Sequence, residues 1–187
     1  MIMIAIGLLP DQARQGITHW PSYPPPYTAL DYALRARRGW LDSYGSKRGC
    51  VRLGGYRRGK LVGFSLLVPD AHAPKRAEFF IAIHPGHLHK GFGSQLTWRT
   101  LEYGFHRHGF TEIHLKVRKD HKVGIRTYSK LGFFKTGKEP KEVTNGILTA
   151  FFAMSLPRKR FLDLEGRAGL TGRPKTGRKV IGHGRSR

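Results

Sequence analysis

The chain has 187 residues, of which 39% are hydrophobic, and this is enough for one domain with a buried core. Its formal net charge is +22, with 34 Lys and Arg against 12 Asp and Glu. An excess of this size is typical of proteins whose partner is a polyanion such as nucleic acid or a ribonucleoprotein. Cys50 is the only cysteine, which excludes a disulfide framework and indicates a reducing, cytoplasmic setting.

The first segment, MIMIAIGLLP, is apolar but has no cationic start and no small-residue cleavage site, so we interpret it as a strand. It is far shorter than the roughly 20 residues that a membrane-spanning helix needs, and we expect no membrane partner. The prolines of residues 19–27 favour an extended loop that carries aromatic side chains. Apolar residues in 28–44 recur near helical spacing.

The middle of the chain contains four segments with clear patterns. Residues 50–68 predict a β-hairpin, because two apolar runs flank the polar turn at 57–60. Residues 77–85 predict a strand that Pro85 ends, and a helix follows over 94–105. Residues 111–119 alternate between apolar and polar side chains, as in a half-buried strand.

The last part of the fold follows the same reasoning, and the composition then changes. Residues 121–134 predict a helix that ends at Gly132, and residues 146–156 predict a closing strand. Residues 158–187 contain ten Lys and Arg against two acids, so this segment holds +8 of the total charge and +14 remains elsewhere. With so few apolar residues, we expect residues 157–187 to be a disordered basic tail behind a domain of residues 1–156.

The stretch HPGHLHKGFGSQL, residues 84–96, lies between a predicted strand and a predicted helix. Gly91 and Gly93 allow a ligand to approach the backbone, and free amides at the beginning of a helix attract phosphate. Lys90 adds a cation. The segment is not a Walker loop, because no Gly-Lys-Ser/Thr follows, and it lacks the third glycine of a dinucleotide fingerprint. Taken alone, it is equally compatible with glycines that only turn the chain.

The same stretch contains three histidines, which raises the question of a metal site. His84, His87 and His89 are close in sequence, but no carboxylate or cysteine lies beside them to complete a ligand set. We therefore expect no metal.

The order of the parts around this loop resembles the GNAT family of N-acetyltransferases. The family's pyrophosphate signature, Arg/Gln-x-x-Gly-x-Gly/Ala, falls on residues 88–93, with Leu88 in the place of Arg or Gln. The family's later Tyr-x-x-x-Gly-Phe segment is present at residues 128–133. The Asn and Ala that frequently precede this tyrosine are here His121 and Gly124. The resemblance rests on motifs over about residues 50–156 and on element order before them.

This resemblance implies an α/β fold with a mixed, mostly antiparallel twisted sheet flanked by helices. It also implies that acetyl-CoA lies where strands 77–85 and 111–119 splay apart, with its pyrophosphate on the amides of residues 89–94. The cofactor-binding residues that it implies are Ile81, Ala82, Ile83, Leu88, His89, Lys90, Gly91, Phe92, Gly93, Ser94 and His121.

Acetyl transfer to an amine needs a neutral nucleophile, a polarised carbonyl group and a proton for the leaving thiolate. Tyr128 matches the family's general acid, although a core aromatic on an amphipathic helix is the alternative. Glu78 resembles the base glutamate of the histone-acetylating branch, although its distance to the glycine loop is one residue shorter and an ion-pair role is the alternative. Trp20, Tyr23 and Tyr27 either shape the acceptor pocket or anchor their loop.

Two functions follow from these observations. The first is transfer of an acetyl group from acetyl-CoA to a primary amine, expected on a macromolecule in a nucleic-acid or ribosomal setting. The second is a catalytically degenerate fold that serves as a basic nucleic-acid-, ribosome- or virion-associated binding module. Leu88 and His121 favour the second, whereas Gly91, Gly93 and Tyr128 favour the first. The acetyl acceptor and the oligomeric state do not follow from the sequence.

Overall fold

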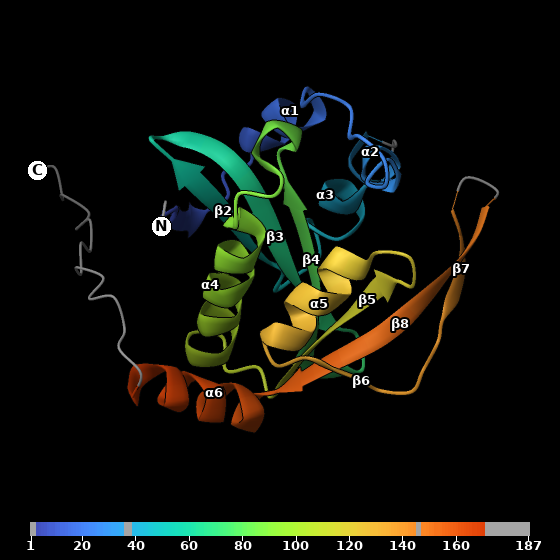
Figure 1. Ribbon diagram of the computed structural model, residues 1–187. Coiled ribbons are helices and arrows are strands. Elements are labelled where there is room, and N and C mark those ends of the chain that lie inside the picture. The colour runs from blue at the N-terminus through green and yellow to red at the C-terminus, as the bar shows by residue number, and fades with distance from the viewer. Residues whose placement is uncertain (1–2, 36–38, 145–146, 171–187) are drawn as a thin grey trace, which may run out of the picture.

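The computed structural model describes residues 3–35, 39–144 and 147–170 (Figure 1). Its sheet has the strand order β1-β2-β3-β4-β5-β8-β6, and β7 pairs with β8 outside this path. Neighbouring strands are antiparallel except for β4 and β5, which are parallel. In chain order the elements are β1 (Ala5–Leu8), α1 (Ala13–Thr18), α2 (Ala29–Arg35), α3 (Trp40–Ser43), β2 (Val51–Arg57), β3 (Lys60–Asp70), β4 (Ala73–Ile83), the 3-10 helix η1 (Pro85–His87), α4 (Phe92–His106), β5 (Glu112–Arg118), α5 (Lys122–Lys130), β6 (Phe134–Lys135), β7 (Lys141–Thr144), β8 (Ile147–Pro157) and α6 (Arg158–Leu170).

The expected hairpin is β2–β3, and its turn explains its register. Arg58 and Gly59 both have positive φ, 49° and 75°, as a two-residue type I′ turn requires. The alternation predicted for residues 111–119 is also present, because Ile113, Leu115 and Val117 of β5 are all buried. The predicted mixed, mostly antiparallel sheet is therefore confirmed.

The parallel pair β4–β5 is short and then opens. Only Arg76–Glu78 of β4 pair with Glu112–His114 of β5, although β4 continues to Ile83 and β5 continues to Arg118. Beyond the paired residues the two strands diverge, and this divergence opens the sheet between them. The structure therefore shows the expected splay of the two strands, which begins where their backbone pairing stops.

The two faces of the sheet carry different helices. Alternate residues of β4 divide between them, because side chains in a strand point in turn to opposite faces. Phe79 and Ile81 pack in the cluster that includes residues of α4, α5 and α6, whereas Phe80 and Ala82 pack with residues of α1, α2 and α3. Figure 1 shows α4 and α5 side by side on one face of the sheet, with α1, α2 and α3 grouped elsewhere.

The C-terminal helix α6 corrects the expectation of disorder, which is wrong for residues 158–170. Phe161 is fully buried and contacts Phe105 and Trp98, each at 4.9 Å between ring centroids. Nε2 of His106 lies 3.0 Å from a carboxylate oxygen of Glu165. The burial of Phe161 against α4 thus holds α6 on the fold, although the composition of this segment is basic and has few apolar residues. Residues 171–187 of the predicted tail lie outside the described residues.

Some elements were not predicted from the sequence. Helix α1 and the short strands β6 and β7 had no expectation, and residues 28–44 contain two short helices, α2 and α3. Residues 19–27 form a loop as expected, but it is not extended throughout, because a hydrogen bond from the Tyr27 amide to the Pro24 carbonyl oxygen closes a turn. Trp20 and Tyr23 are buried in the core. The hydroxyl of Tyr23 donates a hydrogen bond to the carbonyl oxygen of Ile83 at 2.8 Å, so this loop is anchored to the end of β4. None of the helices in the described part of the chain is long and apolar enough to cross a membrane.

Candidate active site

A cavity of about 700 Å³ occupies the opening between β4 and β5. Its walls come from the glycine loop, from both strands, from α5 and from the segment that contains α2 and α3. Most of the site residues expected from the sequence line it, namely Glu78, Ile81, Ala82, Ile83, Leu88, His89, Gly91, Gly93, Ser94, His121 and Tyr128. The fold thus brings together residues that are separated by up to fifty positions.

The glycine loop has the geometry of a phosphate cradle. Gly91 is the N-cap of α4 and has a φ of 78°, which glycine adopts without strain. A Cβ at Gly93 would meet only Ile83, at the ordinary contact distance of 3.7 Å, so the protein itself does not require glycine there. The first amides of a helix have no intrahelical acceptor and lie at the positive end of its dipole. These amides and the bare backbone fit a pyrophosphate group.

Two of the expected cofactor-binding residues do not line the cavity with their side chains. Nζ of Lys90 donates a hydrogen bond to the carbonyl oxygen of Gly86 at 2.6 Å, so the ammonium group folds back over η1. The side chain of Phe92 is fully buried beside Leu96. At these two positions the backbone amide, not the side chain, is the group available to a ligand.

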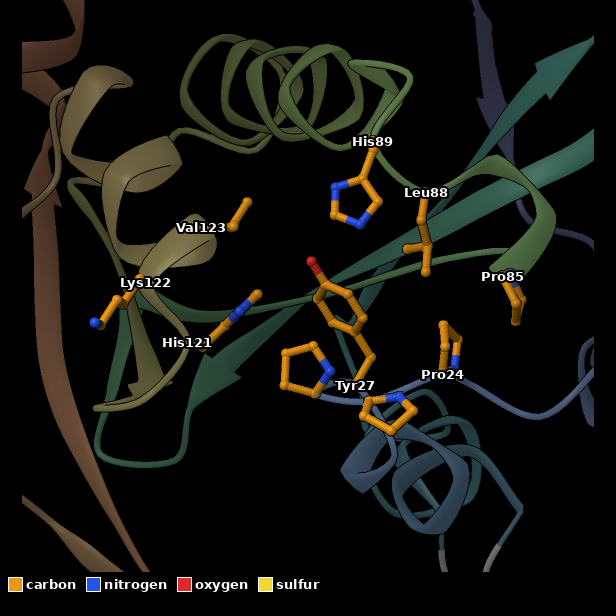
Figure 2. A pocket seen from close by; sticks show the side chains of 10 residues that line it. Pro24, Tyr27, Pro85, Leu88, His89, His121, Lys122 and Val123 are labelled. Carbon is orange, nitrogen blue, oxygen red and sulfur yellow. The ribbon is translucent and has the colours of Figure 1, made fainter.

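The proline-rich loop, the glycine loop and the beginning of α5 meet at one end of the site. Figure 2 shows Tyr27 between His89, His121 and Val123, with prolines of its own loop below. The Tyr27 ring centroid lies 5.8 Å from that of His89 and 5.4 Å from that of His121. A smaller cavity of about 390 Å³ surrounds this ring, which also borders the larger one. Of the three aromatics expected to anchor the loop or shape a pocket, Tyr27 is the one at the cavity.

Tyr128 lies on α5 and is held by two aromatic neighbours. Its ring meets Phe79 edge-on at 6.3 Å and Phe133 at 5.9 Å, and its side chain borders the cavity. Burial raises the pKa of Tyr128 to about 12, so the phenol keeps its proton at neutral pH. The structure therefore presents a neutral hydrogen-bond donor at the opening between the strands.

On the opposite side of the opening, carboxylates and cations are paired. Nζ of Lys116 on β5 lies 3.4 Å from Glu78 of β4 and 2.5 Å from Glu142 of β7. Burial alone lowers the pKa of Lys116, but the hydrogen bonds and charges of Glu142 and Glu78 outweigh it and raise that pKa. Arg118 and Asp120 form two parallel hydrogen bonds of 3.0 and 2.6 Å. Glu78 is thus at the cavity and in an ion pair.

An aromatic wall stands next to these charges, and the sequence did not reveal it. Phe80 of β4 stacks on Tyr44 at 4.6 Å and contacts Trp40 at 5.2 Å, and all three rings border the cavity. One signal was present, because Glu78 and Phe80 are two residues apart in a strand and must share a face. Trp40 and Tyr44 come from a short helix and its C-cap, and no pattern placed them opposite β4.

His87 is a further cavity residue with an unusual environment. Its Nδ1 atom is buried and has no hydrogen-bond partner among the described residues. Burial lowers the pKa of His87, and the nearby charges of Lys90, His84 and Arg57 lower it further, so the ring is neutral at pH 7. The described residues contain no group of three or more His, Cys, Asp or Glu that could hold a metal ion.

Comparison with known proteins gives the family. The family model of the acetyltransferase (GNAT) family matches residues 5–133. The chain belongs to the GNAT acetyltransferase family. Spermidine N(1)-acetyltransferase of Escherichia coli K12 is 34% identical to it over 80 residues, which is 43% of each chain. The uncharacterized N-acetyltransferase YoaA of Bacillus subtilis 168 is 34% identical over 111 residues, 58% of this chain and 62% of that protein.

The matched GNAT structures agree over a longer part of the chain. Spermidine N-acetyltransferase from Vibrio cholerae in complex with CoA and spermine has a TM-score of 0.68 and 22% identity, and the match covers 86% of this chain and 98% of that one. At this identity the likeness shows the fold. By sequence, the chain spans 43% to 62% of the length of the curated relatives named above.

Two departures from the GNAT pattern are physically coupled. A Cβ at Gly124 would collide with the ring of His121, which fills the space that the family's usual alanine needs. Burial lowers the pKa of His121. The charge of Asp120 raises this pKa and that of Arg118 lowers it, and the net shift is downward, so the ring is neutral. The pair His121 and Gly124 therefore replaces Asn and Ala as one packing unit and leaves the beginning of α5 intact.

Proposed function

We propose that this protein transfers an acetyl group from acetyl-CoA to a primary amine. The observation that carries the proposal is the cavity between β4 and β5, which has a phosphate cradle at Gly91 and Gly93 and a neutral phenol, Tyr128, on its wall. Residues Ile81, Ala82 and Ile83 form the strand edge along which an extended ligand lies. Family membership supports the same chemistry.

Two side chains assist the two halves of the reaction. Acetyl-CoA supplies the acetyl group as a thioester, so a new N–C bond replaces the C–S bond, the amine loses a proton, and the sulfur leaves as a thiolate that takes its proton from solvent. Tyr128 donates a hydrogen bond to that sulfur. Because a thiol has a pKa of about 8.5, a phenol with a pKa of about 12 stabilises the thiolate as a hydrogen-bond donor rather than by complete proton loss. Glu78 lies on the acceptor face and accepts the amine proton.

Leu88 bears on whether the binding site is retained. It replaces the Arg or Gln of the family signature, and it is half-buried against the cluster beneath the proline-rich loop. The amides at the beginning of α4 remain in place without it, and backbone donors supply much of the binding in such a cradle. Loss of one side-chain donor therefore lowers affinity but leaves the site.

A thermal-shift titration with acetyl-CoA tests the binding step, and thiol release with a panel of primary amines tests turnover. At a hundredfold excess over Kd, linkage predicts about 2.7 kcal/mol of stabilisation. Stabilisation without thiol release from any amine would favour the degenerate binding module over the enzyme. Absence of stabilisation would remove acetyl-CoA from the proposal.

The acceptor is named here only as a primary amine. The expectation of an amine on a macromolecule in a nucleic-acid or ribosomal setting is supported by the net charge of +22 alone. Relatives whose names specify an acceptor are spermidine acetyltransferases, which points to small amines. A small-amine acceptor is therefore the simpler proposal.

Polyanion binding is a second candidate function, and a feature of α6 favours it. Arg158, Lys159 and Arg160 are consecutive and exposed in the first turn of this helix, where no acidic residue is present. Cations at that end oppose the helix dipole, so they do not serve the stability of the helix. A phosphate backbone is a partner that this cluster fits.

Deletion of residues 171–187 tests the contribution of the last segment, since it removes six cations and no acid while α6 and Phe161 stay in place. If all six contact phosphates of a duplex, the slope of log K against log salt flattens by about 5. A matched variant with residues 158–160 changed to Gln measures the helical cluster separately. Equal slopes for all three proteins would refute phosphate binding by this end of the chain.

A further inference from the structure

We call the part of the cavity that contains the paired charges and the aromatic wall the acceptor side, and its charge is nearly balanced. Its described lining contains three carboxylates, Glu78, Asp120 and Glu142, and two permanent cations, Lys116 and Arg118. Asp120 is held by both hydrogen bonds from Arg118, and Lys116 lies between the other two carboxylates. One formal negative charge therefore remains, shared by Glu78 and Glu142, and it suits one ammonium group.

A polyamine needs more carboxylates without a cation partner than this lining contains. Each of its ammonium groups loses hydration on entry and requires its own carboxylate or equivalent acceptor. To bind one here, Glu142 or Asp120 would have to give up a cation that it already contacts at 2.5 or 2.6 Å. The +14 carried by residues 1–157 adds a long-range repulsion to the same effect.

The rest of the acceptor side is apolar and aromatic. Phe80 is fixed between Tyr44 and Trp40, and Leu30 and Ala33 of α2 extend the same wall. These rings pack on one another before any ligand arrives, so a flat apolar group binds without the cost of ordering them.

The spacing of the two features sets the length of the ligand. Glu78 and Phe80 lie on the same face of β4, and residues two apart in a strand are separated by about 7 Å. An amine beside Glu78 and a ring against Phe80 are thus joined by a short aliphatic linker. We infer that the acceptor is a small arylalkylamine, with a single amino group and an aromatic ring, and not a polyamine. This inference rests on the proposed acetyltransferase function.

The experiment compares four amines with the full chain and acetyl-CoA: phenethylamine, tryptamine, n-butylamine and spermidine. Thiol release gives kcat/KM for each, and thermal shift of the complex with CoA gives binding without turnover. We expect the two aromatic amines to exceed both n-butylamine, which lacks the ring, and spermidine by at least about tenfold in kcat/KM.

Two variants locate the cause of that preference. Phe80→Leu keeps an apolar side chain, and we expect the ratio of phenethylamine to n-butylamine to fall. Lys116→Gln releases Glu78 and Glu142, and we expect the ratio of spermidine to phenethylamine to rise. For each variant, an acetyl-CoA thermal shift equal to that of the wild type shows that the fold and the cofactor side are intact. The wild-type panel stands alone if either variant fails to fold.

The outcomes separate this inference from the function on which it rests. A wild-type preference for spermidine overturns the arylalkylamine assignment and leaves the acetyltransferase in place. Absence of turnover, with phenethylamine stabilising the CoA complex more than spermidine does, supports the assignment of the pocket and refutes the activity. A panel in which no amine is turned over or bound overturns both.

Discussion

The two sides of the cavity are built from different parts of the polypeptide. On the cofactor side the groups that meet a ligand are mostly backbone: the amides of the first turn of α4, the bare Cα of Gly93 and the edge of β4 after its last pair with β5. On the acceptor side they are side chains from α2, α3, β4, β5 and β7 that meet only in the folded protein.

This difference separates two properties of the protein. In the proposed function, the backbone amides and the glycine turn bind the pyrophosphate, so we expect the cofactor side to determine affinity for acetyl-CoA. We expect the paired charges and aromatic rings of the acceptor side to determine selectivity between amines. Substitutions on one side should therefore change one property and leave the other.

Tyr128→Phe should change catalysis alone. Removal of a hydroxyl that stabilises the leaving sulfur acts only as charge develops, so we expect kcat to fall at least about 100-fold while KM for the amine and Kd for acetyl-CoA stay constant. Steady-state kinetics with isothermal titration measure all three. Tyr103→Phe is the matched control, because Tyr103 also packs on the main core but does not border the cavity. A kcat equal to that of the wild type would make Tyr128 a core residue only.

Gly93→Val should weaken acetyl-CoA binding by about 100-fold, or roughly 2.7 kcal/mol, because the side chain occupies the approach of the pyrophosphate. Within the protein the new Cβ meets only Ile83, so the fold should persist. Gly16→Val in α1 is the control, since a Cβ there meets nothing within 4 Å and Gly16 does not line the cavity. If the folded Gly93 variant binds acetyl-CoA normally, the glycine loop does not hold the ligand. The relative kcat/KM values among amines should not change in either variant.

The division also explains which parts could be predicted from the sequence. Gly91, Gly93 and Tyr128, which the structure places at the cavity, could be proposed from the sequence because each belongs to a short continuous motif. Trp40 and Glu142 also line the cavity, but they could not be placed there because they meet it only through strands and helices that are distant in sequence. Helix α6 was missed for a related reason: composition averages over residues, whereas a single buried ring, Phe161, decides whether the segment packs. The mixed sheet and the splay of β4 and β5 were implied by the family resemblance, but β7 had no apolar pattern to mark it.

The contact between His121 and Gly124 leads to a prediction of a smaller effect, whose sign depends on the residue at position 121. Gly124→Ala alone should destabilise, because the new Cβ displaces the His121 ring. In the background of His121→Asn, the same change should stabilise by about 0.5–1 kcal/mol, the usual gain of alanine over glycine in a helix. Free energies of unfolding for the wild type, the two single variants and the double variant give the coupling energy directly. His89→Asn is the matched partner for the control cycle, and additivity is expected there, because the three atoms nearest to a Cβ at Gly124 all belong to His121. Additivity in the first cycle would mean that the two departures are independent.

The smallest effect concerns pH and three histidines, of which His87 and His121 line the cavity and His84 lies beside His87. Burial lowers the pKa of His84, of His87 and of His121, with the charges of neighbouring groups also acting on the latter two. In the unfolded chain a histidine titrates near 6.5, so below that pH the unfolded state binds more protons than the folded state. The contribution of these histidines to the free energy of unfolding is therefore fully present above about pH 7 and is lost as the pH decreases toward 5.

Each of these histidines contributes a slope of at most about 1.4 kcal/mol per pH unit, and partial exposure makes the observed slope smaller. Denaturant unfolding at intervals between pH 5 and 7 measures it. The carboxylates with lowered pKa, Asp120 and Glu139, lose their contribution only at lower pH, so they do not obscure this window. His121→Asn should flatten the slope in this interval, since one of the three protons no longer takes part. A stability that rises on acidification from pH 7 to 5 would show that these rings are charged in the folded state, contrary to the neutral form that their burial favours.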